Sequence, residues 1–376
     1  MEKRKRTTEQ RQDLRLSVLF VVFLTILALL LLLLPKREVS DLERRSLAKA
    51  PVLNWDSLRS GQFTSGAETF VSDHFPGRAF WVGTYSYAEA LLGGRTDVML
   101  GKDGRLFSAP AQPSARLAGN LEVLHDFAAA QTIPVKTLFV PTAGFQLPAD
   151  LPLNHPTWRD GEILDQAGSA LSDVSMNIDL RDALTEEADY YRTDHHWTAA
   201  GAYAAYRAYC RAAGLTALEK EAFSVEQFPG FYGTTYAKAG LWGVLPDTIE
   251  LWQTGTAFRV TIADDGREPV ERDELFFREE LEGADGYAVY LGGNHSRVTV
   301  ENPAAAGGKL LIIKDSFAHA LTPFLAEHYR EITMIDLRYW RSGAVSELAA
   351  EGGYNEILFV YGVDSLAENN DLLWLR

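Results

Sequence analysis

The sequence predicts an α/β protein in which a mostly parallel sheet is flanked by helices, interrupted by a β-rich insertion and preceded by one N-terminal transmembrane helix. Three observations support this. A long apolar run follows a basic N-terminus, short β-rich runs alternate with helical segments, and closely spaced strand-like runs break that alternation. Strands that alternate with helices imply a largely parallel sheet with helices on both faces. At 376 residues, 47% of them apolar, the chain is long enough for one large or two modest domains.

The first segment is an expected membrane anchor. Residues 1–15 are basic, and the uncharged apolar run from Leu16 to Pro35 matches the roughly 30 Å hydrocarbon core of a bilayer. A cleaved signal peptide is the alternative, but its apolar run usually has about 7–15 residues and ends in small residues, whereas this one ends in LLLLLPKRE. We expect a single-pass cell-membrane protein with residues 1–15 in the cytoplasm and everything after Lys36 outside it. Basic residues also follow the span, so the charge bias is imperfect.

Composition excludes some classes of partner. The formal net charge of −15 argues against a nucleic-acid surface, which needs a concentrated basic face. The single cysteine, Cys210, excludes an intramolecular disulfide and a cysteine-rich zinc site. Its alanine- and tyrosine-rich surroundings predict a helical position in which it packs as a small buried hydrophobic residue.

Residues 36–106 are expected to form a linker and a capping segment. Where it meets the next segment, VMLGKDGRLF, residues 98–107, predicts a β-hairpin because two apolar runs flank an Asp-Gly turn. Residues 107–376 carry the α/β alternation. Its first half predicts helix 117–131, strand 133–141, helix 163–174 and helix 199–213, the last ended by Gly214.

An insertion at about 223–303 changes this character. The runs TIELW, AFRVTI, YAVYLGG and SRVTV predict short, mainly antiparallel strands in a position to roof a site. After it the alternation resumes with strand 309–314, helix 317–329, strand 331–337, helix 344–351 and strand 355–362.

Two adjacent histidines stand in the stretch TDHHWT, residues 193–198. If this stretch is extended, side chains alternate, so Asp194 and His196 point to one side and His195 to the other. An aspartate that holds an imidazole in one tautomer is half of a nucleophilic triad. The structural alternative is that Asp194 and Thr198 cap the following helix while both histidines pack or form hydrogen bonds.

A nucleophile is available where strand 309–314 ends. Asp315 and Ser316 form a turn, and a helix begins at about Phe317. Ligands of open α/β sheets bind beyond the carboxyl ends of the strands, and the backbone N–H groups at this helix start, that of Phe317 included, suit a developing oxyanion. The alternative is that Ser316 only caps the helix.

Five stretches together resemble the bacterial DHHW protein family, a relative of the alginate O-acetylation proteins with SGNH-hydrolase-like domains. They are TDHHWT, KDSFAHAL, DHFPGR, GKDGRLF and LFVPTAGFQLPADLP. The resemblance covers nearly all of the chain after the anchor and implies an SGNH-hydrolase-like (flavodoxin-like) sheet. It also implies an acyl-transfer site with Ser316 as nucleophile, His196 as general base and Asp194 as its orienter. Lys314 departs from the SGNH pattern, because it stands where the glycine of Gly-Asp-Ser would be.

The resemblance further implies a function and partners. In such relatives a membrane-bound O-acyltransferase passes acetyl groups across the membrane, and the exported SGNH-like protein transfers them to polysaccharide hydroxyls. We therefore expect an extracytoplasmic O-acetyltransferase without a cofactor or metal. A carbohydrate esterase with the same triad differs only in that water attacks the acyl-enzyme. A non-catalytic polysaccharide-binding or scaffold protein is a further alternative.

A metal site at Asp194, His195 and His196 is a weaker alternative. Catalytic zinc normally has three protein ligands, and adjacent histidines on an extended strand cannot easily face one ion.

Four further residues are candidates for the rim of the site. Gly292 and Asn294 in LGGNH can offer a backbone N–H and a side-chain amide to an oxyanion, although Gly-Gly-Asn is equally good turn chemistry. Arg338 follows a strand and can reach the rim, although an arginine there is usually only a solvated charge. Trp197 offers a face for stacking a sugar, although such aromatics more often pack in the core.

Overall fold

The computed structural model describes residues 8–40, 43–92, 97–283 and 285–375. By its internal contacts the chain divides into two units. The smaller unit comprises Met1–Ala88 and Gly240–Trp242, and the larger one comprises Glu89–Ala239 and Gly243–Arg376. The predicted hairpin at residues 98–107 thus belongs to the larger unit.

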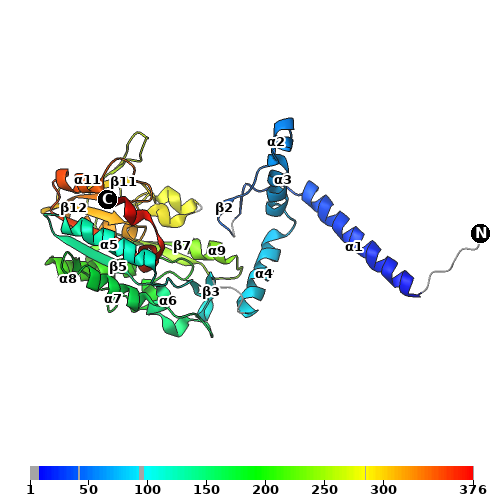
Figure 1. The fold of residues 1–376 in the computed structure, drawn as a ribbon, viewed down its shortest axis with the longest axis horizontal. Coiled ribbons are helices and arrows are strands. Elements are labelled where there is room, and N and C mark those ends of the chain that lie inside the picture. Colours follow the sequence, from blue (N-terminus) through cyan, green and yellow to red (C-terminus); the bar gives the residue numbers. More distant parts are fainter. Residues whose placement is uncertain (1–7, 41–42, 93–96, 284, 376) are drawn as a thin grey trace, which may run out of the picture. The chain divides into compact units, whose positions relative to one another are not determined.

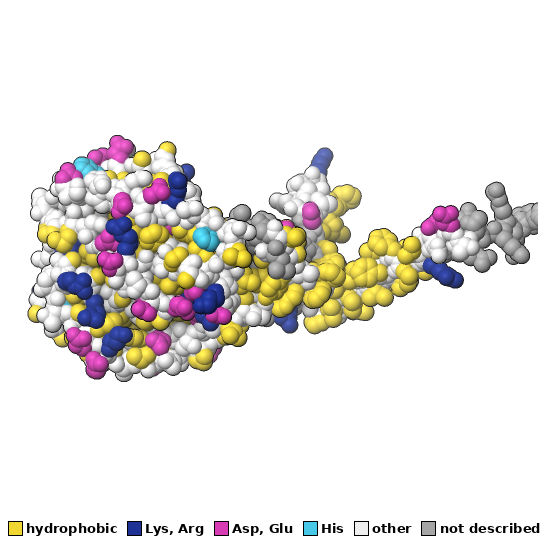
Figure 2. Space-filling view, turned by 90° about the horizontal axis from the view of Figure 1, so that it is seen from below, with side chains coloured by type: hydrophobic (Ala, Val, Ile, Leu, Met, Phe, Trp, Pro, Cys, Tyr) yellow, Lys and Arg dark blue, Asp and Glu magenta, His cyan; other side chains and the backbone are white. Residues whose placement is uncertain are grey.

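The smaller unit begins with helix α1 (Thr8–Leu33). In the described part of the chain, its segment Gln12–Leu33 is the one stretch of helix long and apolar enough to cross a membrane, and none of that stretch is buried. Figure 2 shows apolar side chains along this helix. The unit continues with β1 (Val39–Ser40), β2 (Arg45–Ser46), α2 (Trp55–Arg59), α3 (Gln62–Asp73) and most of α4 (Arg78–Leu92).

The larger unit (Figure 1) is built on an eight-stranded sheet. Its strand order is β10-β9-β11-β13-β12-β14-β5-β6. The strands from β13 to β6 run parallel, and β11, β9 and β10 extend one edge in antiparallel fashion. In spatial order these strands are Val270–Arg272, Arg259–Ile262, Arg297–Glu301, Tyr329–Ile335, Gly307–Lys314, Glu356–Gly362, Val135–Val140 and Met176–Asn177. The predicted mostly parallel sheet is therefore present.

Helices cover both faces of this sheet. Successive strand residues point to opposite faces, so Leu310 and Ile312 of β12 pack with α8 and α10, whereas Leu311 and Ile313 pack with α5, α7, α11 and α12. These helices are α5 (Ala115–Ala129), α7 (Asp160–Ala170), α8 (Ala199–Ala213), α10 (Ala318–Leu325), α11 (Val345–Glu351) and α12 (Val363–Glu368). Two hydrophobic cores result, one on each side of the sheet.

Helix α8 has the predicted bounds for a local reason. The Thr198 side chain accepts from the Gly201 N–H at its start, and Gly214, with a φ of 70°, ends it. Cys210 is buried on this helix, as expected. The predicted hairpin is also present, as β3 (Val98–Leu100) paired with β4 (Leu106–Ser108).

The insertion is divided between two sheets. The strands β7 (Ser224–Phe231) and β8 (Asp247–Gln253) form a separate antiparallel pair, whereas β9, β10 and β11 join the edge of the main sheet. The YAVYLGG run is not a strand, contrary to the prediction. Gly286–Val289 forms a 3-10 helix, and the residues after Tyr290 have positive φ, which breaks an extended backbone.

Helix α10 is shorter than predicted. It ends at Leu325, and Tyr329 already pairs with Gly307 as the first residue of β13. The apolar spacing continues past the helix because the following strand is buried as well.

The carboxyl ends of four parallel strands meet at one edge of the sheet. They are Lys314 of β12, Ile335 of β13, Gly362 of β14 and Val140 of β5. The residues that follow these ends are therefore brought close together, at the edge where such sheets bind ligands.

Candidate active site

Ser316 lies directly beyond the carboxyl end of β12, in the turn before α10. The turn is held to β14, because the Asp315 N–H donates to the Val360 carbonyl at 3.0 Å and the Gly362 N–H donates to the Asp315 carboxylate at 2.8 Å. Burial raises the pKa of Asp315 to about 6. The serine is thus presented at the sheet edge on a fixed backbone.

His196 reaches the same edge from the loop before α8. Residues 192–196 form a series of bends rather than an extended strand. Asp247 of β8 pins this loop, since its carboxylate accepts from the Arg192 and Thr193 N–H groups at 3.0 and 2.8 Å. These long-range bonds fix where the histidines point.

Ser316, His196 and Asp194 form a hydrogen-bonded chain. His196 Nε2 lies 2.7 Å from Ser316 Oγ, and His196 Nδ1 lies 2.5 Å from Asp194 Oδ1. Because a carboxylate only accepts, Nδ1 of His196 carries a proton, and Nε2 can accept one from Ser316. The arrangement is that of a nucleophile, a base and an orienting carboxylate.

The Asp194 carboxylate is buried and paired on both oxygens. Oδ1 also accepts from the His196 N–H at 3.0 Å, and Oδ2 accepts from the N–H and hydroxyl of Thr234 at 2.6 and 3.0 Å. Thr234 begins α9 (Thr234–Ala239). Burial alone would raise the pKa of Asp194, but the attraction of His196 and His195 and these hydrogen bonds outweigh it and hold that pKa well below its ordinary value. Asp194 is therefore an anion.

The His196 ring is enclosed by aromatic side chains. It stacks on Tyr287 with ring centroids 4.0 Å apart and planes at 6°, and it meets Phe317 at 5.0 Å. Burial lowers the pKa of His196 to about 4, and His195 adds to this effect. The imidazole is therefore neutral at pH 7, the state in which it can take a proton from Ser316.

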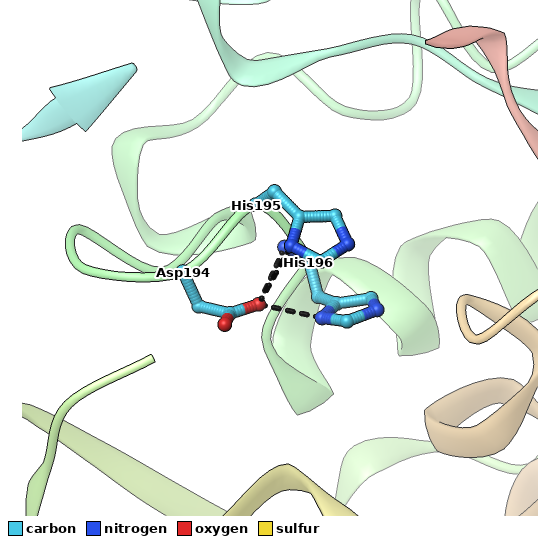
Figure 3. Close-up of side chains that lie close together, drawn as sticks. All are labelled: Asp194, His195 and His196. Carbon is cyan, nitrogen blue, oxygen red and sulfur yellow. Dashed lines mark hydrogen bonds and ion pairs between the residues drawn. The ribbon is translucent and has the colours of Figure 1, made fainter. Parts of the chain in front are cut away.

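His195 does not point away from Asp194 and His196, contrary to the alternation argument. Figure 3 shows the three side chains together, and the centroids of the two imidazole rings are 3.8 Å apart. The bends at residues 192–196 remove the period-two geometry of a strand. The His195 side chain is 29% exposed, against 5% for His196, so the two rings differ in access to solvent.

The same cluster has the spacing of a metal site. One ligand atom from each of Asp194, His195 and His196 lies within 4.8 Å of the others. Both ring nitrogens of His196 and both oxygens of Asp194 are, however, already engaged in hydrogen bonds. A cation would have to displace the Asp194–His196 bond or the His196–Ser316 bond, so the donor set fits the hydrogen-bonded chain better.

Phe317 and Trp197 have structural roles rather than the predicted ones. The Phe317 N–H donates to Asp315 Oδ1 at 3.0 Å, because the aspartate two residues earlier reaches it, and it is not free for an oxyanion. Trp197 is fully buried and offers no face to a sugar. Its Nε1 donates to the Phe317 carbonyl at 3.1 Å and so joins the histidine loop to the serine turn.

A buried charge network holds Arg338 at the sheet edge. Lys314 is almost completely buried, and its Nζ lies 2.9 Å from Asp336 Oδ2. Asp336 accepts from Arg338 Nε and Nη2 at 2.8 and 2.6 Å, and Nη2 also donates to Asn294 Oδ1 at 3.0 Å. The Arg338 charge favours ionised Asp315 and so opposes the effect of burial on the pKa of Asp315. Lys314, which stands where the SGNH pattern has a glycine, therefore forms an ion pair with Asp336 that a glycine could not form.

Gly292 lies in a different environment. It has a φ of 77° and, together with His295, lines a cavity of about 250 Å³ beside β9 and β10. None of the residues that line this cavity belongs to the Ser316–His196–Asp194 chain. The structure therefore brings Asn294, but not Gly292, into the network around the serine turn.

Three residues that shape the site were not predicted from the sequence. They are Thr234, Asp247 and Tyr287, which contact the DHHW loop from the insertion. The one related feature of the sequence is the pair of threonines at the start of α9. Threonine is common at helix starts, so this pair does not predict a contact with Asp194.

Solved structures with TM-scores above 0.5 share this fold. A structure of a DHHW family protein from Eubacterium siraeum is similar, with 25% identity, a TM-score of 0.61 and coverage of 73% of this chain and 96% of that one. Bacillus cereus PatB1 with a sulfonyl adduct has 19% identity and a TM-score of 0.64, over 74% of this chain and 98% of that one. The O-acetyltransferase domain of Pseudomonas putida AlgJ aligns at a TM-score of 0.45, with 16% identity over 74% of this chain and 95% of that one. No curated protein matches the sequence significantly.

The family model described as DHHW protein matches residues 175–335. This range contains Asp194, His196 and Ser316, the three residues of the hydrogen-bonded chain. Residues 175–335 therefore match the DHHW protein family model, and the whole larger unit has a mixed α/β fold with a mostly parallel sheet.

Proposed function

We propose that the protein is a membrane-anchored extracytoplasmic O-acetyltransferase that modifies a cell-surface or secreted polysaccharide. The observation that carries the proposal is the chain from Ser316 Oγ through His196 to Asp194, with bonds of 2.7 and 2.5 Å. The DHHW match over residues 175–335 supports the same kind of chemistry.

The first half-reaction follows from the protonation states. Ser316 Oγ attacks the acetyl carbonyl while His196 Nε2 takes its proton, and the imidazolium returns that proton to the leaving group. Asp194 stabilises the imidazolium through the Nδ1–H bond. Because Thr234 and the His196 N–H already hold its carboxylate, little reorganisation accompanies the charge transfer.

We propose that Arg338 and Asn294 stabilise the oxyanion, because the Phe317 N–H already donates to Asp315. Asp336 holds the guanidinium in place, and Asn294 accepts from it through its oxygen, which leaves the Asn294 amide N–H₂ to donate. Loss of one oxyanion donor costs on the order of 10²–10³-fold in rate. Arg338→Ala should lose that much acylation, measured as release of 4-nitrophenol from its acetate ester.

The proposed location and partners depend on α1 as a membrane anchor. If α1 spans the membrane, the larger unit lies outside the cytoplasm with the polysaccharide, and a membrane-bound O-acyltransferase supplies the acetyl group. Figure 2 shows positive and negative side chains intermixed on the visible face of the larger unit.

The test is mass spectrometry of the full chain in detergent after exposure to 4-nitrophenyl acetate. The wild type should gain one acetyl group on Ser316, Ser316→Ala none there, and Asp194→Asn should acylate on the order of 10⁴-fold more slowly because its imidazole can adopt the wrong tautomer. A sulfonyl fluoride is a second probe, chosen because PatB1 carries a sulfonyl adduct. It should label Ser316 and fail to label Ser316→Ala.

Three other outcomes would each indicate a different function. Discharge of the acetyl group by an oligosaccharide no faster than by water would indicate an esterase. No reaction of Ser316 with either probe would indicate a non-catalytic polysaccharide-binding protein. Activity that EDTA removes and zinc restores would indicate a metal site at Asp194, His195 and His196.

A further inference from the structure

The hydrogen bonds assign a tautomer to His195. Thr234 Oγ1 lies 3.0 Å from Asp194 Oδ2 and 2.8 Å from His195 Nδ1, yet its hydroxyl has one hydrogen. A carboxylate only accepts, so the hydroxyl donates to Asp194 and its oxygen accepts from His195 Nδ1–H. Neutral His195 therefore carries its proton on Nδ1 and a lone pair on Nε2.

The two histidines present their Nε2 atoms on the same side. In Figure 3 both rings turn Nδ1 toward Asp194 and the other nitrogen away from it. His196 Nε2 is bound to Ser316 Oγ, whereas His195 Nε2 has no hydrogen-bond partner among the residues that the structure describes. Because the His195 side chain is 29% exposed and its ring lies against that of His196, this second acceptor is partly accessible to a ligand.

We propose that His195 accepts a hydrogen bond from the hydroxyl next to the one that is acetylated, so that the acceptor is a vicinal diol of a sugar. The inference rests on the proposed acyl transfer at Ser316. When one sugar oxygen lies between His196 Nε2 and acetyl-Ser316, the oxygen on the adjacent carbon is within reach of the second ring, because the two ring centroids are only 3.8 Å apart. Water has no second hydroxyl, so this contact favours transfer over hydrolysis.

The transfer step balances without a further reactant. The acceptor oxygen attacks the acetyl carbon of acetyl-Ser316, and its proton passes to His196 Nε2. The bond from the acetyl carbon to Ser316 Oγ then breaks, and His196 returns the same proton to Oγ. The neighbouring hydroxyl keeps its proton and only donates a hydrogen bond to His195 Nε2, so it orients the acceptor without reacting.

The experiment compares acceptors on one acyl-enzyme. Full-length protein in detergent is acetylated with 4-nitrophenyl acetate, and transfer is measured to cyclohexanol, to cis- and trans-cyclohexane-1,2-diol and to the corresponding 2-methoxycyclohexanols. One diol isomer should be acetylated roughly 2- to 12-fold faster than cyclohexanol, the worth of one hydrogen bond. In the corresponding 2-methoxycyclohexanol the second oxygen carries no hydrogen to donate to His195, so this compound should react like cyclohexanol.

Variants connect this preference to His195. His195→Phe keeps the ring but no acceptor nitrogen, so the ratio of diol to cyclohexanol should fall to about one, while His195→Gln, which keeps an acceptor, should retain part of it. The half-exposed His125 of α5 provides a matched control, and His125→Phe should keep the wild-type ratio. Because the readout is a ratio, a general loss of activity cancels.

The outcomes separate the two proposals. Equal rates for both diols and cyclohexanol in the wild type, or an unchanged ratio in His195→Phe, would overturn the diol inference while acetyl transfer stands. A methyl ether that reacts as fast as the diol would overturn it too. Failure of Ser316 to gain an acetyl group before any acceptor is added would overturn the proposed function instead.

Discussion

At the residue scale, the position of Asp194 depends on the absence of a side chain at Gly233. A Cβ there would lie 2.2 Å from both Cβ and Oδ2 of Asp194. Gly233→Ala should therefore displace the carboxylate and lower the rate of Ser316 acylation on the order of 10²-fold, as misplacement by about 1 Å does elsewhere. Gly119→Ala on α5, where a Cβ meets nothing within 4 Å, is the matched control and should acylate like the wild type. Full activity of a folded Gly233→Ala would contradict this account.

The protonation of His196 predicts the pH dependence of acylation. Burial holds the pKa of His196 near 4, and only the neutral ring can act as base. The rate with 4-nitrophenyl acetate should therefore rise with pH around the pKa of His196. It should reach its plateau before pH 6.5, the ordinary pKa of histidine. A half-maximal rate at or above pH 6.5 would show that the ring is more solvated than the structure indicates.

At the element scale, the end of β12 depends on the buried pair of Lys314 and Asp336. Lys314→Met removes the ammonium and leaves Asp336 with Arg338 alone, and breaking such a pair costs about 3–5 kcal/mol. We expect the free energy of unfolding to fall by about 3 kcal/mol, since one partner remains. Adding Asp336→Asn should cost less than the sum of the two single changes, as in a coupled pair. Additive effects in urea unfolding would rule out the coupling.

The start of α7 makes a separate contribution to pH-dependent stability. Asp160 is buried, and its Oδ2 accepts from the N–H and hydroxyl of Thr142, both at 2.7 Å, which ties α7 to the end of β5. Burial raises its pKa to about 6. The folded state thus binds this proton more tightly than the unfolded chain, so the stabilisation is present below pH 4 and is lost as the pH rises to about 6.

The variant Asp160→Asn should remove that dependence. Relative to the variant, wild-type stability should fall by up to about 3 kcal/mol between pH 4 and pH 7, which corresponds to a shift of about two pKa units. The comparison is made by urea unfolding at each pH. Asp182→Asn, at an exposed carboxylate, should leave the wild-type profile unchanged. Parallel profiles for wild type and Asp160→Asn would contradict the prediction.

At the scale of the whole molecule, the apolar helix α1 leads to a prediction of topology. Segment Gln12–Leu33 is exposed and apolar, and the residues before it are basic. If these residues stay in the cytoplasm, a protease added to intact cells should digest the chain after Lys36. Full protection of that region would place it in the cytoplasm and remove extracytoplasmic glycans as substrates.

Local sequence patterns were sufficient to predict many of the helices and strands. Helix α8 follows from its apolar spacing, its Thr198 cap and Gly214, and the β3–β4 hairpin follows from Asp-Gly. Strands such as β12 were recognisable because buried parallel strands are continuous apolar runs. The YAVYLGG run was wrongly predicted as a strand because it is also apolar. Apolar composition does not reveal the positive φ values that follow Tyr290.

For the site, the sequence alone determined which residues were candidates: Asp194 and His196 before one helix, Ser316 at a strand end, and an anchor ahead of them. Only the tertiary structure decided their geometry. Asp247 and Thr234, from the insertion, bend the DHHW loop so that His195 lies beside His196, and Asp315 takes the Phe317 N–H. The physical reason is that residue type and spacing encode local conformation, whereas the direction of a loop side chain is set by hydrogen bonds to residues about 40–120 positions away, which only the assembled sheet brings within reach.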